Sequence, residues 1–385
     1  MDMNCGNRRR FIVSGLVAAA LLGTSALGAS AHENEDASGR ADAGDHAVFV
    51  QTNDPAGNQV LAYQRARNGA LGLAGTYDAG GTGGRVEGSA VDPLASQDSL
   101  VYDARHELLI GVNAGSDAIY AFHVEGDRLT GRDVVSSGGS FPVSVAVHGN
   151  LVYALNAGGM GSVQGYRVDD GHLRPIADSL RTLGLTPVSG PATFLNTPGQ
   201  IGFTPDGDHL IVTTKANGSH IDVFNVGRDG ELSATPVQNT AATPVPFGFT
   251  FDARDRLVVG EAATSSVSTY VVQENGSLRT IASQSDSQAA LCWIARADRL
   301  YFVANSGSGT VSSYRVDASG HPSVVSTTAV GPGPIDLVAT RGGSFLYVQL
   351  GGNGMVAGFK VNADGSLTPV GTVAAHPGME GLVAI

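Results

Sequence analysis

Short segments in which hydrophobic and polar positions alternate recur from residue 47 to the end of the chain, and this alternation predicts β-strands. One type of strand is especially regular, because it carries an aromatic residue at its fourth position. These aromatic residues are Tyr63, Phe122, Tyr166, Phe224, Tyr270, Tyr314 and Phe359. Most are about 45 residues apart, which is the period of a four-stranded propeller blade. The pattern therefore predicts an all-β protein, a seven-bladed β-propeller with four-stranded antiparallel blades.

The two ends of the repeated region predict how the ring closes. We name the strands of a blade A to D from the central channel outward, with the aromatic residue in strand C. Residues 47–50 then form a strand B with no strand A before it, and residues 381–385 form a strand A with nothing after it. We expect the C-terminal strand to complete the first blade as its innermost strand, because this pairing leaves no open sheet edge.

Two connections are longer than the others, residues 79–97 and 177–199, and each joins strand D of one blade to strand A of the next. D–A and B–C connections reach the same face, which we call the loop-rich face. A–B and C–D turns reach the opposite one, the turn face. Binding residues are often carried by long loops on a rigid scaffold. We therefore expect a site at the channel mouth on the loop-rich face.

The N-terminus has the features of an export signal. Arg8, Arg9 and Arg10 precede an apolar run, residues 12–27, and residues 29–31 have the small-residue pattern that signal peptidase accepts. We predict a signal peptide at 1–31, a short disordered leader at 32–46 and a propeller domain at 47–385. The arginines resemble a twin-arginine signal, and both the Tat and the Sec route stay open. We expect a periplasmic or extracellular protein that has no membrane association once the signal is cleaved.

Composition narrows the choice of partners. The chain has 23 Lys and Arg against 35 Asp and Glu, a formal net charge of -12, which argues against nucleic acid as a partner. Signal cleavage would remove Cys5 and leave Cys292 as the sole cysteine, so no intramolecular disulfide is expected. The thiol of Cys292 and the ring of Trp293 are expected to pack in the core. We expect a monomer.

Several motifs carry a family resemblance. Tyr-Arg-Val and Phe-x-Val strands, Asp-Gly turns before Leu-Thr, and the segment Phe203-Thr204-Pro205-Asp206-Gly207 resemble those of the seven-bladed β-propeller lactonases. That family includes propeller-type 6-phosphogluconolactonases and fungal carboxy-muconate cyclases. The resemblance implies hydrolysis or cyclisation of a small lactone or carboxylate. It also implies a histidine at the place held here by Gln200, and a glutamine can orient a substrate but cannot shuttle a proton.

Candidate catalytic residues follow from the ends of the B strands. Lys215 and Glu261 are charged where the other blades have neutral amides, and they fall on adjacent blades, so we expect an ion pair. Lys215 or Arg85 would polarise a carbonyl, and Glu261 or His220 would act as the base. The alternatives are a structural salt bridge for the pair and an exposed strand position for His220.

Candidate substrate-binding residues come from the channel wall, the strand ends and the first long connection. They are Gln200, Ser144 and Asp336 on the A strands, Asn156 and Asn305 at the ends of B strands, and Arg85 in the first connection. The asparagines could instead serve turn formation, and small polar residues suit a narrow hydrated axis. The sequence has no metal-ligating motif, nucleophile elbow or phosphate-binding loop, so we expect neither a metal nor another cofactor.

Two functions remain open. One is an exported lactonase-like propeller, and its substrate would be a neutral or singly charged lactone, because an acidic surface is expected to offer few cations at any one mouth. The other is a non-catalytic secreted propeller that binds a small ligand or a protein partner with its loop-rich face.

Overall fold

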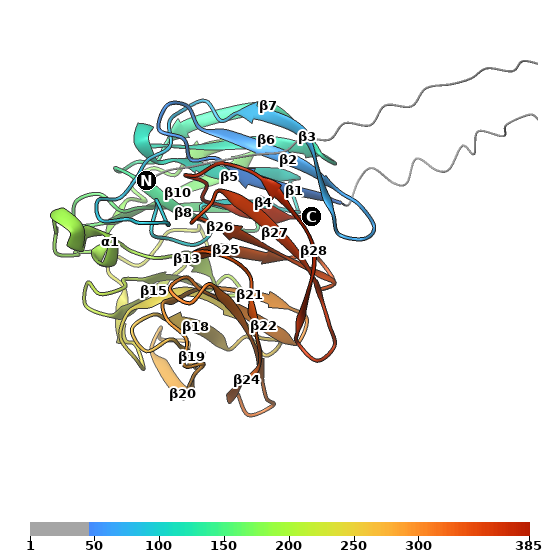
Figure 1. Cartoon of the computed structure of the whole chain (residues 1–385). Helices are drawn as coiled ribbons and strands as arrows, with labels where there is room; N and C mark the ends of the chain where they lie inside the picture. Colours follow the sequence, from blue (N-terminus) through green and yellow to red (C-terminus); the bar gives the residue numbers. More distant parts are fainter. Residues whose placement is uncertain (1–45) are drawn as a thin grey trace, which may run out of the picture. The chain divides into compact units, whose positions relative to one another are not determined.

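The structure is a computed structural model that describes residues 46–385, in which seven sheets are arranged as the blades of a propeller (Figure 1). The predicted signal peptide and all but the last residue of the predicted leader lie outside the described residues. Strands supply nearly all of the regular structure. The exceptions within the described part are the 3₁₀ turns η1 (Ala114–Ser116) and η2 (Gly190–Ala192) and the one-turn helix α1 (Thr193–Asn196).

Each blade is an antiparallel sheet of strands that follow one another in sequence, except where the ring closes. From the channel outward, the first three blades are β29 (Leu382–Ala384), β1 (Ala47–Gln51), β2 (Gln59–Arg65) and β3 (Leu71–Asp78); β4 (Leu100–Asp103), β5 (Leu108–Asn113), β6 (Ala118–Glu125) and β7 (Arg128–Ser136); and β8 (Pro142–His148), β9 (Leu151–Asn156), β10 (Ser162–Asp169) and β11 (His172–Pro175), with β12 (Arg181–Thr182) also on β10.

The other four blades have the same order. They are β13 (Ile201–Phe203), β14 (His209–Thr213), β15 (His220–Asn225) and β16 (Val237–Thr240); β17 (Pro246–Phe251), β18 (Leu257–Glu261), β19 (Ser266–Val272) and β20 (Leu278–Ser285); β21 (Leu291–Ala297), β22 (Leu300–Asn305), β23 (Thr310–Val316) and β24 (Pro322–Ala329); and β25 (Pro334–Ala339), β26 (Phe345–Leu350), β27 (Met355–Val361) and β28 (Leu367–Ala374).

The predicted closure of the ring is confirmed. β29 pairs with β1 in antiparallel register, so that Val50 faces Leu382 and Val48 faces Ala384. The blue strands of the first blade consequently lie beside the red strands of the seventh blade in Figure 1. This pairing gives β1 a neighbour on both sides and removes the sheet edge that an open ring would expose.

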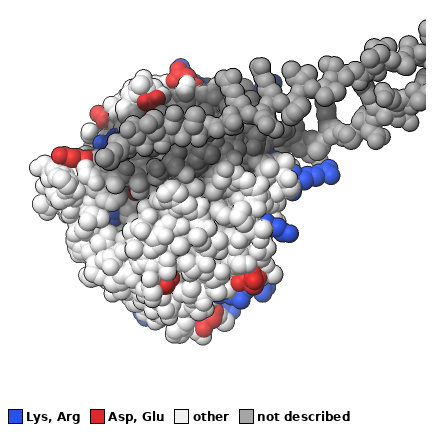
Figure 2. Space-filling view, viewed as in Figure 1, with Lys and Arg blue, Asp and Glu red and all other residues white. Residues whose placement is uncertain are grey.

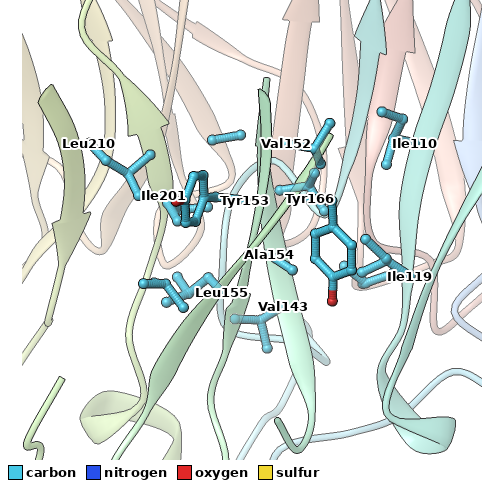
Figure 3. Close-up of a cluster of buried hydrophobic side chains, with 14 of the residues drawn as sticks. Ile110, Ile119, Val143, Val152, Tyr153, Ala154, Leu155, Tyr166, Ile201 and Leu210 are labelled. Carbon is cyan, nitrogen blue, oxygen red and sulfur yellow. The ribbon is translucent and has the colours of Figure 1, made fainter. Parts of the chain in front are cut away.

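The core lies between neighbouring blades, because the alternating strands place one row of apolar side chains against each neighbour. Figure 3 shows one such region, where Val143, Tyr153 and Tyr166 of the third blade lie between Ile119 of the second blade and Ile201 of the fourth. All seven predicted aromatic positions are buried. Some also link blades through hydrogen bonds: the hydroxyl of Tyr166 donates to the Ser136 carbonyl of the preceding blade at 2.5 Å. The aromatic repeat therefore marks contacts that hold the ring together.

Candidate functional site

The first long connection lies across the channel mouth on the loop-rich face instead of surrounding it. We call residues 86–98 the strap. Its Ser96 hydroxyl donates to the Val143 carbonyl of the third blade at 2.7 Å, and its Ser96 carbonyl accepts from Trp293 Nε1 of the sixth blade at 2.8 Å. On the seventh blade, a Cβ added at Gly351 would lie 2.3 Å from the Val91 carbonyl oxygen. A segment that touches the third, sixth and seventh blades must cross the axis, so the strap fills this mouth.

Lys215 binds the strap from the side of the propeller body. Its side chain is fully buried, and Nζ donates to the Ala95 carbonyl at 2.6 Å, the Phe194 carbonyl at 2.8 Å and Thr197 Oγ1 at 2.9 Å. Those partners belong to both long connections, and they engage all three protons of the ammonium group. Burial lowers the pKa of Lys215 to about 8, although the charge of Asp92 opposes this shift. The side chain therefore fixes the two connections to each other and to the fourth blade.

The expected ion pair between Lys215 and Glu261 does not form, and that prediction was wrong. Glu261 is fully buried in its own blade, where its carboxylate accepts from the Thr243 hydroxyl, the Ser268 hydroxyl and the Tyr270 hydroxyl, each at 2.5 Å. Burial raises the pKa of Glu261, and these hydroxyls oppose the rise. The pair fails because the strap presents carbonyl oxygens to Lys215, while hydroxyl donors of the fifth blade and its entry connection surround Glu261.

His220 stands apart from both residues. It begins β15 and is half-buried, and its backbone exchanges hydrogen bonds with Thr214. In the described part of the chain, no hydrogen bond or ion pair joins His220 to Lys215 or Glu261. The three residues predicted to be catalytic are therefore held by separate sets of partners, and their catalytic role stays a prediction.

Three of the predicted binding residues serve the scaffold. The Ser144 hydroxyl donates to the Gln97 carbonyl at 2.6 Å and so holds the strap against the third blade. Asn156 Nδ2 donates to the Ser137 carbonyl, and Asn305 Nδ2 donates to the Ser312 hydroxyl, both at 3.0 Å. Each asparagine is fully buried, and neither lines the axial cavity that contains Asp336.

Gln200 and Asp336 lie beneath the strap, at the inner end of a cavity of about 250 Å³. Asp336 lines this cavity together with Asp98, a residue that sequence reasoning missed. Gln200 Nε2 donates to Asp98 Oδ2, and Gln200 Oε1 accepts from the Phe249 backbone N–H, so the amide is held in one orientation. Arg296 also lines the cavity, which places the opening near the turn face.

The two carboxyl groups of this cavity have unusual proton affinities. Asp98 is partly exposed, and burial raises its pKa to about 7 even though the hydrogen bond from Gln200 favours the ionised form. Burial raises the pKa of Asp336 well above its ordinary value, and the nearby charge of Asp98 adds to the effect. Asp98 is therefore close to half ionised at neutral pH, and burial disfavours the ionised form of Asp336 as well. We call Asp98 and Asp336 the carboxyl pair.

Two more acids lie in the closed part of the channel. Asp92 of the strap and Glu380, which precedes the closing strand, are both almost fully buried, and their carboxyl groups share a hydrogen bond. Burial raises the pKa of Asp92 to about 6 and that of Glu380 well above its ordinary value. In residues 46–385, no group of three or more His, Cys, Asp or Glu side chains is arranged to hold a metal ion.

Basic side chains gather near the opening of the axial cavity, because Arg296 lines both the cavity and a neighbouring groove. A groove of the turn face, formed by the fifth, sixth and seventh blades, is lined by Arg254, Arg256, Arg296, Arg299 and Arg315, with Asp252, Asp298 and Asp317 among them. The face visible in Figure 2 is largely uncharged, and its basic side chains stand mainly along one edge. The groove therefore has a local excess of positive charge on an acidic protein.

The molecule is a seven-bladed propeller. Its seven blades close into a ring, and a small polar cavity lies on the axis of that ring. The family model described as Lactonase, 7-bladed beta-propeller matches residues 100–294. The chain belongs to this lactonase family.

Solved structures agree on the fold. The Pseudomonas aeruginosa periplasmic gluconolactonase PpgL has a TM-score of 0.69 and 17% identity, with 88% of this chain and 98% of that chain covered. A candidate 6-phosphogluconolactonase of Bacteroides uniformis has a TM-score of 0.68 and 18% identity, with 88% and 99% covered. A Lactobacillus plantarum protein gives 0.69 and 17%, with 88% and 98% covered. Among curated proteins, no relative matches this chain.

Proposed function

We propose that this protein hydrolyses a small lactone, and that the carboxyl pair in the axial cavity beneath the strap performs the reaction. The observation that carries the proposal is that two carboxyl groups line a single open cavity, and burial raises the pKa of each. Hydrolysis of a lactone needs a base for the attacking water and a proton donor for the oxygen atoms of the ester. Two carboxyl groups whose pKa values are driven apart can fill these two roles.

The chemistry assigns one role to each side chain. Asp98 carboxylate takes a proton from water as the water oxygen bonds to the lactone carbonyl carbon. The protonated Asp336 donates a hydrogen bond to the ester and transfers its proton to the ring oxygen when the ring C–O bond breaks. The proton held by Asp98 then returns to Asp336, and the product is the open hydroxy acid. Gln200 acts on Asp98 alone and is a positioning residue.

The cavity limits the size and charge of the substrate. A volume of about 250 Å³ is below the usual range for drug-sized ligands and suits a single five- or six-membered lactone. Arg296 at the opening tolerates one negative charge on the substrate. We therefore propose a neutral or singly charged lactone as the substrate.

The test is hydrolysis of a panel of γ- and δ-lactones by the purified chain, followed by pH-stat titration. Asp98→Asn and Asp336→Asn are expected to lower kcat at least about 100-fold, which is the usual contribution of general acid–base catalysis. The rate of the wild-type protein should rise with pH through about 7, because Asp98 must be ionised. Asp364→Asn, at an exposed turn of the seventh blade, is the control and should retain full activity.

Two results would count against this assignment. Full activity in Asp98→Asn would refute the role of the carboxyl pair but leave lactone hydrolysis in place. If the folded wild-type protein hydrolyses none of the lactones, the propeller is a non-catalytic binding protein instead.

We further propose that the protein is exported. Residues 8–31 support this with their arginines, apolar run and small-residue cleavage pattern. Within residues 46–385, no helix has the length and apolar character of a membrane span. Mass spectrometry of the protein from its native host should find a chain that starts at His32. An intact Met1 in the isolated protein would contradict export by this route.

A further inference from the structure

A second cavity lies on the loop-rich face, away from the channel axis, and the two long connections form it together. Glu87 Oε2 accepts from the Gly190 backbone N–H at 2.9 Å, which joins the strap to the second connection. The cavity between them has a volume of about 280 Å³. We call it the loop-face pocket. Because Thr197 lines it and also accepts from the fully buried Lys215, its floor is fixed to the body of the propeller.

The lining of the loop-face pocket is mainly apolar. Val86, Phe141, Leu185, Pro187 and Val188 contribute hydrocarbon or ring surface from three separate segments. The apolar surface continues outside on the same connection, where Leu195 is 46% exposed. Burial of hydrocarbon in such a pocket is favourable by about 25 cal/mol for each Å² removed from water. The lining therefore favours a ligand with a hydrocarbon body.

Two charged side chains stand on the rim of this pocket. Arg85 uses Nη1 for the Ser89 carbonyl and hydroxyl at 3.2 and 3.4 Å, and it is exposed, so the rest of its guanidinium faces outward to a ligand or to water. Glu87 is held by its bond to Gly190. A guanidinium binds a carboxylate well, whereas the neighbouring Glu87 disfavours a ligand with two negative charges.

We propose that the loop-face pocket binds a small amphipathic monocarboxylate, with its hydrocarbon chain against Val86, Phe141 and Leu185 and its carboxylate on Arg85. This site is separate from the carboxyl pair and goes beyond the proposed hydrolysis. It requires no chemical step, because the ligand is bound unchanged. The two long connections would then form a binding pocket together on the loop-rich face, where the strap closes the channel mouth.

The test uses octanoate as the probe and isothermal titration calorimetry on the purified chain. Octanoate should bind with a 1:1 stoichiometry. 1-Octanol, which lacks the carboxylate, and acetate, which lacks the hydrocarbon chain, should each bind at least about tenfold more weakly. Arg85→Ala should raise the Kd at least about tenfold, consistent with the loss of a charge-assisted hydrogen bond. Arg67→Ala, which removes an exposed arginine of the first blade, is the matched control and should leave the Kd unchanged.

A second variant tests the position of the hydrocarbon chain. Ala157 lines the pocket and is buried, so Ala157→Phe should fill the cavity and abolish octanoate binding. Asp98→Asn should bind octanoate as the wild type does, which separates this site from the hydrolytic one. The proposal is overturned if wild-type protein does not bind octanoate at millimolar concentration, if 1-octanol binds equally well, or if Arg85→Ala and Ala157→Phe both bind with wild-type affinity.

Discussion

Replacement of Lys215 by methionine tests how the strap is held, because it removes the ammonium group but keeps a side chain of similar length. The pKa of Lys215 falls from 10.5 to about 8 in the folded protein. A group whose pKa is lower in the folded than in the unfolded state destabilises the folded protein at pH values below the folded-state pKa. This destabilisation disappears as the pH rises toward the pKa of the unfolded state. For this shift, the contribution of Lys215 to the free energy of unfolding should increase by about 1 to 2 kcal/mol from pH 8 to pH 9.5.

The assay is urea unfolding at these two pH values, followed by the fluorescence of Trp293. Trp293 is the sole tryptophan and donates to the strap at Ser96, so its emission reports on the segment that Lys215 holds. The difference in unfolding free energy between wild type and Lys215→Met should change by the stated amount, because only the wild type carries this ammonium group. Lys360→Met removes the other lysine, which is exposed, and serves as the control. The same pH dependence in wild type and Lys215→Met would refute the buried, hydrogen-bonded ammonium.

Other predictions concern the channel and the strap. The raised pKa of Asp98 stabilises the folded protein at low pH, and this stabilisation is lost as the pH rises through about 7. The unfolding free energy of Asp98→Asn should therefore decrease less from pH 5 to pH 7.5 than that of the wild type. An equal decrease would contradict the shift. Gly248→Ala would place a Cβ 2.1 Å from Gln97 Oε1 and should lower the free energy of unfolding by about 1–3 kcal/mol, whereas Gly57→Ala, with open space around it, should have little effect. Thermal denaturation of both variants decides this, and equal Tm values would show that the strap adapts freely.

The repeat carried enough information to predict the fold. A strand with a buried aromatic residue recurs once in each blade, and only a ring gives every such residue a neighbouring blade to pack against. The unmatched strands at residues 47–50 and 381–385 fixed the closing pair, which the register of Val50 with Leu382 confirms.

The site was harder to predict, because the strap has no periodicity. Lys215 finds a partner 120 positions away in Ala95, and no pattern in the sequence relates these two residues. The assumption that one charged strand end would seek another failed because backbone carbonyls also satisfy a buried ammonium. Asp98 escaped notice because it lies just before strand β4, outside the A-strand positions that supplied Gln200, Ser144 and Asp336.

The site of hydrolysis can be located directly by a crystal structure of Asp98→Asn soaked with δ-valerolactone. The account predicts electron density for the intact lactone in the axial cavity beneath the strap, with an ester oxygen within hydrogen-bond distance of Asp336. Density for the lactone beside Lys215 or His220 on the loop-rich face, with the strap displaced from the channel mouth, would contradict it.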